Sequence, residues 1–237
     1  MKDPATLPRL FVSSDRREAE PWVARWENVR KLSAPVNWAR TGTWRGRPMI
    51  ALANGVGAQR ALAGIHTVRT VTEHPSEIWS IGTGGALDPD LAIAEVVVAN
   101  SVTNGHRVWQ ALDPLGPPAR SGTVHSVSRI VRTCEEKKNL HETGAILVEM
   151  EAAGVASMAY ELAIPFYCVR VVSDLAEESF FIDFEEFLLP DGQFNVAGLL
   201  RFAMEHPLKG LPELLRLQER TAKAAKHLAE FLAECIL

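Results

Sequence analysis

Two stretches of the sequence, VEMEAA at residues 148–153 and VRVVSD at residues 169–174, decide the expected fold. The first passes from a buried run into acidic residues where helical periodicity begins. The second is a continuous apolar strand that delivers Ser173 and Asp174 at its carboxyl end. In open α/β sheets, small-molecule sites lie beyond the carboxyl ends of the strands. We therefore expect a ligand site where these two stretches end.

Strands alternate with helices along the rest of the chain. We expect further strands at 9–13, 49–52 (the second arm of a hairpin over 43–53), 78–81 and 95–99. A first helix is expected around Trp22, Trp26 and Val29, and others from 58 to about 73, at 132–142 and at 151–163. Two more helices are expected after Asn195, broken at Pro207 and Pro212. This alternation predicts a single three-layer α/β domain over residues 1–237, with a central, mainly parallel mixed sheet flanked by helices.

The composition excludes several classes of protein. A net charge of -4 and an isoelectric point near 6.0 argue against a nucleic-acid-binding or anionic-membrane surface. The three cysteines lack CxxC spacing and the seven histidines form no HxxxH or HExxH motif, so neither a disulfide framework nor a metal site is indicated. No signal-peptide region opens the sequence and no apolar run reaches membrane-spanning length. We expect a cytoplasmic protein without a membrane partner.

Two glycine-rich segments invite a nucleotide-binding interpretation and fail it. In GVGAQR at residues 55–60, Arg60 stands where a dinucleotide fingerprint needs Gly or Ala. In GTGGAL at residues 82–87, Leu87 stands at the same place. A dinucleotide-dependent oxidoreductase is therefore disfavoured. We expect 82–86 to be a loop whose backbone amides, with the Thr83 hydroxyl, can approach a ligand.

The acidic residues of the two decisive stretches allow two interpretations. Glu149 and Glu151 are two apart, so on an extended chain they share a face and could act together. Alternatively, both cap the following helix, whose positive end favours acidic side chains. Asp174 could also serve as a helix cap. The charged run Glu135–Lys138 is expected to be a solvated helix face.

Together these residues resemble the purine nucleoside phosphorylase and nucleosidase superfamily over nearly the whole chain. The resemblance is carried by four segments in the right order: the first strand and its loop to Glu18, NGVG at 54–57, IGTGGAL at 81–87, and the pair formed by 148–151 with Ser173 and Asp174. Residues 182–187 are also similar to methylthioadenosine/S-adenosylhomocysteine nucleosidases. Residues 136–145 and the tail with Arg201 and Pro207 look more like hopanoid-associated nucleoside phosphorylases.

The resemblance implies cleavage of the N-glycosidic bond of a purine nucleoside, with adenine as the expected base. Asp174, oriented by Ser173, would protonate N7 of the departing purine. Glu151 would accept hydrogen bonds from the ribose hydroxyls and stabilise the oxocarbenium-like ring. The implied catalytic residues are Asp174, Glu18 and Ser173, and the implied substrate-binding residues are Glu151, Met150, Thr83, Gly84 and Glu149.

The nucleophile distinguishes the two branches of the superfamily. Phosphorylases place arginines at two positions that fall on Glu18 and Ser80 here, whereas nucleosidases have a glutamate at the first position as general base for water. A carboxylate beside a phosphate dianion is repelled by several kcal/mol at about 4 Å, so hydrolysis is favoured and no cofactor is expected. A slip of one or two residues would instead place Arg16 or Arg17 there, with inorganic phosphate as co-substrate. A nucleoside-binding protein without catalysis is a further alternative, and superfamily membership implies a homo-oligomer.

Overall fold

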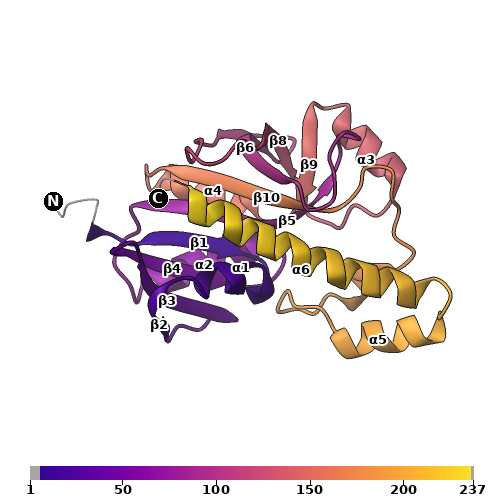
Figure 1. The fold of residues 1–237 in the computed structure, drawn as a ribbon, viewed down its shortest axis with the longest axis horizontal. Coiled ribbons are helices and arrows are strands. Elements are labelled where there is room, and N and C mark those ends of the chain that lie inside the picture. The colour runs from indigo at the N-terminus through magenta and orange to yellow at the C-terminus, as the bar shows by residue number, and fades with distance from the viewer. Residues whose placement is uncertain (1–5, 236–237) are drawn as a thin grey trace.

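The computed structural model of the chain describes residues 6–235 and shows a central mixed sheet covered by helices (Figure 1). The strands are β1 (Arg9–Ser13), β2 (Glu27–Lys31), β3 (Trp38–Trp44), β4 (Arg47–Ala53), β5 (Glu77–Ala86), β6 (Val96–Thr103), β7 (Val108–Gln110), β8 (Arg120–Ser126), β9 (Ala145–Glu149) and β10 (Phe166–Asp174). The α-helices are α1 (Arg16–Val23), α2 (Ala58–Arg69), α3 (Cys134–His141), α4 (Ala152–Glu161), α5 (Val196–Glu205) and α6 (Gly210–Glu234), and η2 (Phe184–Phe187) is a 3₁₀ turn. The expected α/β class and the helix-flanked mixed sheet are confirmed.

The order of the strands brings the ends of β5, β9 and β10 together. The sheet runs β10-β6-β8-β9-β5-β1-β4-β3-β2, and β5 pairs a second time with β10, so five of its strands close into a ring. Among residues 6–235, parallel and antiparallel pairings are equally frequent, rather than mainly parallel as expected. Strand closure forces this mixture, because β9 and β6 join the ring antiparallel to β5 and β10.

Helices cover the two faces of the sheet with separate apolar cores. Buried residues of α2 and α4, such as Ile65 and Val155, pack on one face together with Leu10 and Leu52. On the other face α1 and the long α6 cross the sheet (Figure 1). There Trp22 and Trp79 are fully buried and Phe11 stacks on Trp79 at 5.4 Å between ring centroids. The tryptophans of this core are structural. No helix of residues 6–235 is long and apolar enough to cross a membrane.

The glycine-rich segment 82–86 is not the loop that the sequence predicts. It continues β5 and pairs with β10, with Thr83 opposite Val171 and Gly84 opposite Val172. Glycine is needed here because side chains approach the backbone closely. A Cβ on Gly82, whose φ is +150°, would lie 2.9 Å from the Glu18 carboxylate, and one on Gly85 would lie 2.8 Å from Asp174 Oδ2. The segment is a strand that carries two carboxylates against its backbone.

Two expected helix boundaries are also wrong. The first helix ends at Val23, and Val29 lies in strand β2 next to Asn28, whose positive φ of 54° is incompatible with a continuing helix. Pro207 separates α5 from α6 as expected, but Pro212 lies inside the first turn of α6. A proline is tolerated there because first-turn amides have no intrahelical acceptor.

Candidate active site

The expected site residues converge at the carboxyl ends of β5, β9 and β10. Asp174 and Ser173 end β10, and Asp174 is paired in register with Gly85 of β5. Glu149 ends β9, with Met150 half-buried after it and Glu151 at the start of α4. Glu18 reaches the same point from α1, where its carboxylate contacts Thr83. Four carboxylates therefore meet within one small region, each with different partners.

Asp174 is buried and held on both of its oxygens. Ser173 Oγ donates to Oδ1 at 2.7 Å and also lies 3.1 Å from the Gly84 carbonyl oxygen. Lys137 Nζ donates to Oδ2 at 2.5 Å, and this lysine is completely buried. The expected solvated face over Glu135–Lys138 is thus wrong for Lys137, which turns inward because Asp174 offers it a counter-charge.

Glu18 is bound to the backbone of the glycine-rich strand. Its Oε1 accepts hydrogen bonds from the Thr83 amide and the Thr83 hydroxyl, both at 2.8 Å. Its Oε2 accepts from the Ser14 hydroxyl at 2.9 Å and from the Ser14 amide at 3.2 Å. Glu18 also completes the capping box of α1 with Asp15. The residue is therefore more than an exposed helix-start side chain.

The neighbouring arginines take no part in this arrangement. Arg17 pairs with Asp15 at 2.9 Å, and Arg16 lies 3.9 Å from Glu20, with both side chains about two-thirds exposed. Ser80, the other position where a phosphorylase would carry an arginine, is buried and accepts a hydrogen bond from Arg170. The Thr83 amide and hydroxyl, which could bind an anion, are occupied by the protein's own carboxylate.

Glu149 forms a buried ion pair and caps a helix. Its Oε2 lies 2.6 Å from Arg170 Nη2, and both side chains are 1% exposed. The same carboxylate accepts hydrogen bonds from the amides of Glu151 and Ala152, at 2.9 and 2.8 Å. Burial acts to lower the pKa of the Arg170 guanidinium, but the acidic groups around it, Glu149 first among them, together raise it. The capping interpretation therefore describes Glu149, whose oxygens are taken up by protein donors.

Glu151 is buried, and among residues 6–235 its carboxylate has one hydrogen-bond partner, the amide of Gly57 at the start of α2, which donates to Oε1 at 2.8 Å. Burial raises the pKa of Glu151 to about 8, and the nearby charges of Glu149 and Glu18 act in the same direction, against Arg170. A buried carboxyl group with spare acceptor capacity is suited to bind a ligand that brings its own hydroxyl donors.

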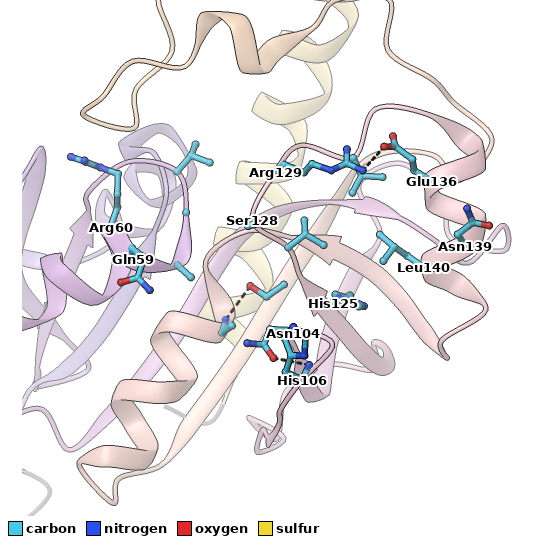
Figure 2. Close-up of a pocket in the computed structure, with 17 residues that line it drawn as sticks. Gln59, Arg60, Asn104, His106, His125, Ser128, Arg129, Glu136, Asn139 and Leu140 are labelled. Atoms are coloured by element: carbon cyan, nitrogen blue, oxygen red, sulfur yellow. Dashed lines mark hydrogen bonds and ion pairs between the residues drawn. The ribbon is translucent and has the colours of Figure 1, made fainter.

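A cavity of about 780 Å³ adjoins this cluster (Figure 2). It is lined by Gly57, whose amide donates to Glu151, and by Ala153 in the first turn of α4. Residues of the β6–β7 turn, the end of β8 and α3 also line it. Asn104, His106 and His125 lie together on one side, and Arg129 pairs with Glu136 at 2.6 Å across from them. The volume suits a small molecule. None of the carboxylates of the cluster lines this cavity, and neither do Ser173, Thr83 or Met150. The cavity approaches the cluster at Gly57, whose amide donates to Glu151.

Sequence reasoning missed three residues of this region. Arg170 could have been found, because a charged residue inside an apolar strand signals a buried counter-charge. Lys137 gave no signal, since a charged helix looks the same whichever side chain turns inward. His125 is buried, burial lowers its pKa, and its Nδ1 has no hydrogen-bond partner among residues 6–235. No cluster of three His, Cys, Asp or Glu side chains in that range could hold a metal ion.

A search with protein-family models finds one match, described as the phosphorylase superfamily, over residues 23–112 and 106–200. Among curated proteins, the 5'-methylthioadenosine/S-adenosylhomocysteine nucleosidase of Lysinibacillus sphaericus is 24% identical over 211 residues, covering 75% of this chain and 90% of that protein. The nucleosidase of the same name from Haemophilus ducreyi is 27% identical over 167 residues, covering 58% and 72%.

Solved structures share the fold at lower identity. The 5'-methylthioadenosine/S-adenosylhomocysteine nucleosidase of Neisseria meningitidis, in complex with methylthio-immucillin-A, superposes with a TM-score of 0.70 at 19% identity, covering 96% of this chain and 97% of that one. The futalosine hydrolase of Helicobacter pylori superposes with a TM-score of 0.71 at 16% identity, covering 97% of each chain.

Removing Arg170 should destabilise the protein strongly, because Glu149 would be left as a buried, unpaired charge. We expect Arg170→Met to lower the free energy of unfolding by about 3–5 kcal/mol, measured by urea denaturation. Arg16→Met, which breaks an exposed pair, is the control and should change it by less than about 1 kcal/mol. A loss below 1 kcal/mol for Arg170→Met would contradict the ion pair.

Replacing Glu151 should stabilise the free protein in a pH-dependent way. Because the pKa of Glu151 is raised in the folded state, the folded protein binds more protons than the unfolded chain from about pH 4.5 to about pH 8. Wild-type stability therefore falls as pH rises through this window. Glu151→Gln removes the titration, so its melting temperature should exceed that of the wild type by an amount that grows from pH 5 to pH 8, reaching a few degrees. A difference that does not depend on pH would contradict the raised pKa.

Proposed function

Because this chain belongs to the phosphorylase superfamily, we propose that it hydrolyses the N-glycosidic bond of a purine nucleoside, with adenine as the base. The curated relatives in the comparison are named as nucleosidases of adenine-bearing nucleosides. The site geometry supports the same chemistry, because an acid, a ribose-binding carboxylate and a candidate base for water meet where β5, β9 and β10 end.

The position of Glu18 is the observation that favours water over phosphate as the nucleophile. Its carboxylate occupies the Thr83 amide and hydroxyl, both at 2.8 Å, where a phosphate would need donors. A phosphate dianion would have to displace this carboxylate or lie beside it, and the repulsion amounts to several kcal/mol at about 4 Å. Arg16 and Arg17 form exposed pairs with acidic neighbours instead. These observations favour hydrolysis over phosphorolysis.

In the proposed reaction, Glu18 accepts a proton from the attacking water. The lone pairs of its carboxylate are filled by donors from Ser14, Asp15 and Thr83. Two of these donors are hydroxyl groups, which can rotate to other acceptors and leave room for a water molecule. The amides then keep the carboxylate in place while the water is activated.

The other carboxylates act on the nucleoside itself. Asp174, oriented by Ser173, protonates N7 of the purine, so that the base leaves as a neutral molecule. Glu151 binds the ribose hydroxyls, and in its ionised form it stabilises the oxocarbenium-like ring. Met150 packs against the ribose, and Thr83 and Gly84 border the nucleophile and the base. Glu149 contributes indirectly, by capping α4 and fixing the backbone of Glu151.

The proposal also covers cofactors, assembly and location. Water and side chains suffice, so the reaction needs no cofactor or metal. We also propose a homo-oligomer and a cytoplasmic location, since purine nucleosides are intracellular metabolites and superfamily members assemble. Phosphorolysis is the alternative within enzymes, and nucleoside binding without catalysis is the alternative outside them.

A nucleoside panel tests the function directly. We expect base release from adenosine, methylthioadenosine or S-adenosylhomocysteine, at the same rate with and without inorganic phosphate and with free sugar as the second product. Inosine serves as the comparison for the base. Release that requires phosphate and yields a sugar 1-phosphate would mean phosphorolysis. Binding of a nucleoside in calorimetry without any release would favour a binding protein.

Glu18→Gln should reduce hydrolysis by about 10²–10⁴-fold, because the amide cannot accept a proton from water. The variant keeps a hydrogen-bond acceptor for the Thr83 amide, so the fold should be retained. Glu20→Gln, an exposed residue of the same helix, is the matched control and should leave turnover unchanged. Turnover of Glu18→Gln within twofold of the wild type would exclude Glu18 as the base.

A further inference from the structure

Lys137 is a completely buried lysine that has no role in the reaction proposed above. It lies in α3, whose other described residues are half-buried or exposed, and its side chain reaches under the end of β10. Its Nζ donates to Asp174 Oδ2 at 2.5 Å and to the Leu175 carbonyl oxygen at 2.6 Å, and lies 5.4 Å from the centre of the Phe180 ring. The ammonium group is thus enclosed by one carboxylate, one carbonyl and one aromatic face.

Stability alone is a weak reason for such a lysine. Lysine is almost never fully buried unless it is paired, because its hydrated ammonium is costly to transfer from water. A buried ion pair often contributes no more to stability than well-packed apolar side chains of similar volume. The partner here is the residue proposed to protonate the leaving base, so a role in that proton transfer is the more specific explanation.

We propose that Lys137 supplies the proton that Asp174 passes to the leaving purine; this inference rests on the function proposed above. Among the described partners of Nζ, only Asp174 can take up a proton, because a carbonyl oxygen and an aromatic ring cannot. Ser173 holds Oδ1 while Lys137 holds Oδ2, so the carboxylate is fixed between proton supply and substrate. Lys137 is a positioning residue that acts through Asp174.

Each proton that moves in this reaction has a donor and an acceptor among Lys137, Asp174, Glu18, the purine and water. As the bond from C1' to the purine breaks, its electron pair goes to the base, and Asp174 delivers a proton to N7. Lys137 transfers a proton from Nζ to Asp174 Oδ2 and becomes a neutral amine. Water adds to C1' and gives a proton to Glu18. After the products leave, the proton on Glu18 passes to solvent, and one from solvent restores the Lys137–Asp174 pair.

The test uses two substrates that differ in their need for a proton. A purine nucleoside must be protonated to leave, whereas 4-nitrophenyl riboside releases a stable phenolate without protonation. We expect Lys137→Met and Lys137→Gln to lose about 10²-fold or more in kcat on the purine nucleoside. On 4-nitrophenyl riboside both variants should stay within about threefold of the wild type, because only the acid is impaired. Lys138→Met, at an exposed neighbouring lysine, is the control and should match the wild type on both substrates.

The two variants separate proton supply from orientation. Glutamine can still donate a hydrogen bond to Asp174 but has no proton to give, so retained purine turnover in Lys137→Gln would overturn the inference. An equal loss on both substrates would also overturn it, because that pattern indicates structural damage. If Lys137→Met does not fold, Lys137→Gln decides alone. The double variant Lys137→Met/Asp174→Asn should be no slower on the purine nucleoside than Asp174→Asn, since both residues serve one step.

Failure of this inference is distinguishable from failure of the proposed function. If the wild type releases no base from any nucleoside, the function is wrong and the role of Lys137 falls with it. If the wild type cleaves purine nucleosides and the Lys137 variants cleave them equally fast, the function stands and only the inference is wrong.

Discussion

The arrangement of the site depends on one buried ion pair, Arg170–Glu149, at 2.6 Å. Arg170 projects from the middle of β10 and also donates to Ser80 of β5, so it ties two strands to the end of β9. Glu149 in turn accepts the first amides of α4 and so fixes the turn that carries Glu151. Since an unpaired charge at this depth is costly, the strand ends and the helix start can adopt few other arrangements.

The four carboxylates of the region differ because their partners differ. Glu149 faces a guanidinium, Asp174 an ammonium, Glu18 the amide and hydroxyl of Thr83, and Glu151 the amide of Gly57. Sites that catalyse acid–base reactions typically place neighbouring titratable groups in different environments, so that the groups can take different roles in proton transfer. Glu149 is thereby committed to structure. In the proposed function, Asp174 is the acid, Glu18 activates the water and Glu151 binds the sugar. The phosphorylase superfamily fold supplies the strand ends, and in the proposed function these local partners favour hydrolysis over phosphorolysis.

The sequence predicted the parts of the site that depend on local pattern. The apolar run that ends in Ser173 and Asp174 and the acidic start of α4 are visible in the residues themselves. It could not predict that 82–86 continues a strand, because glycines in a row indicate a turn, and only pairing with β10 reveals the strand. It could not show that Lys137 turns inward, because the burial of a lysine on a charged helix depends on a partner thirty-seven residues away. Contacts between distant strands decided these points.

A crystal structure with an iminoribitol analogue of adenosine, grown in phosphate buffer, tests the central claim most directly. Hydrolysis predicts that the ring hydroxyls lie on Glu151, that N7 of the base lies on Asp174 beside Lys137, and that a water molecule lies between Glu18 and the ring. A phosphate bound to the Thr83 amide in place of Glu18 would contradict hydrolysis. An analogue held only by the cavity around His125 and Arg129, without contact to Glu151 or Asp174, would contradict the proposed site as a whole.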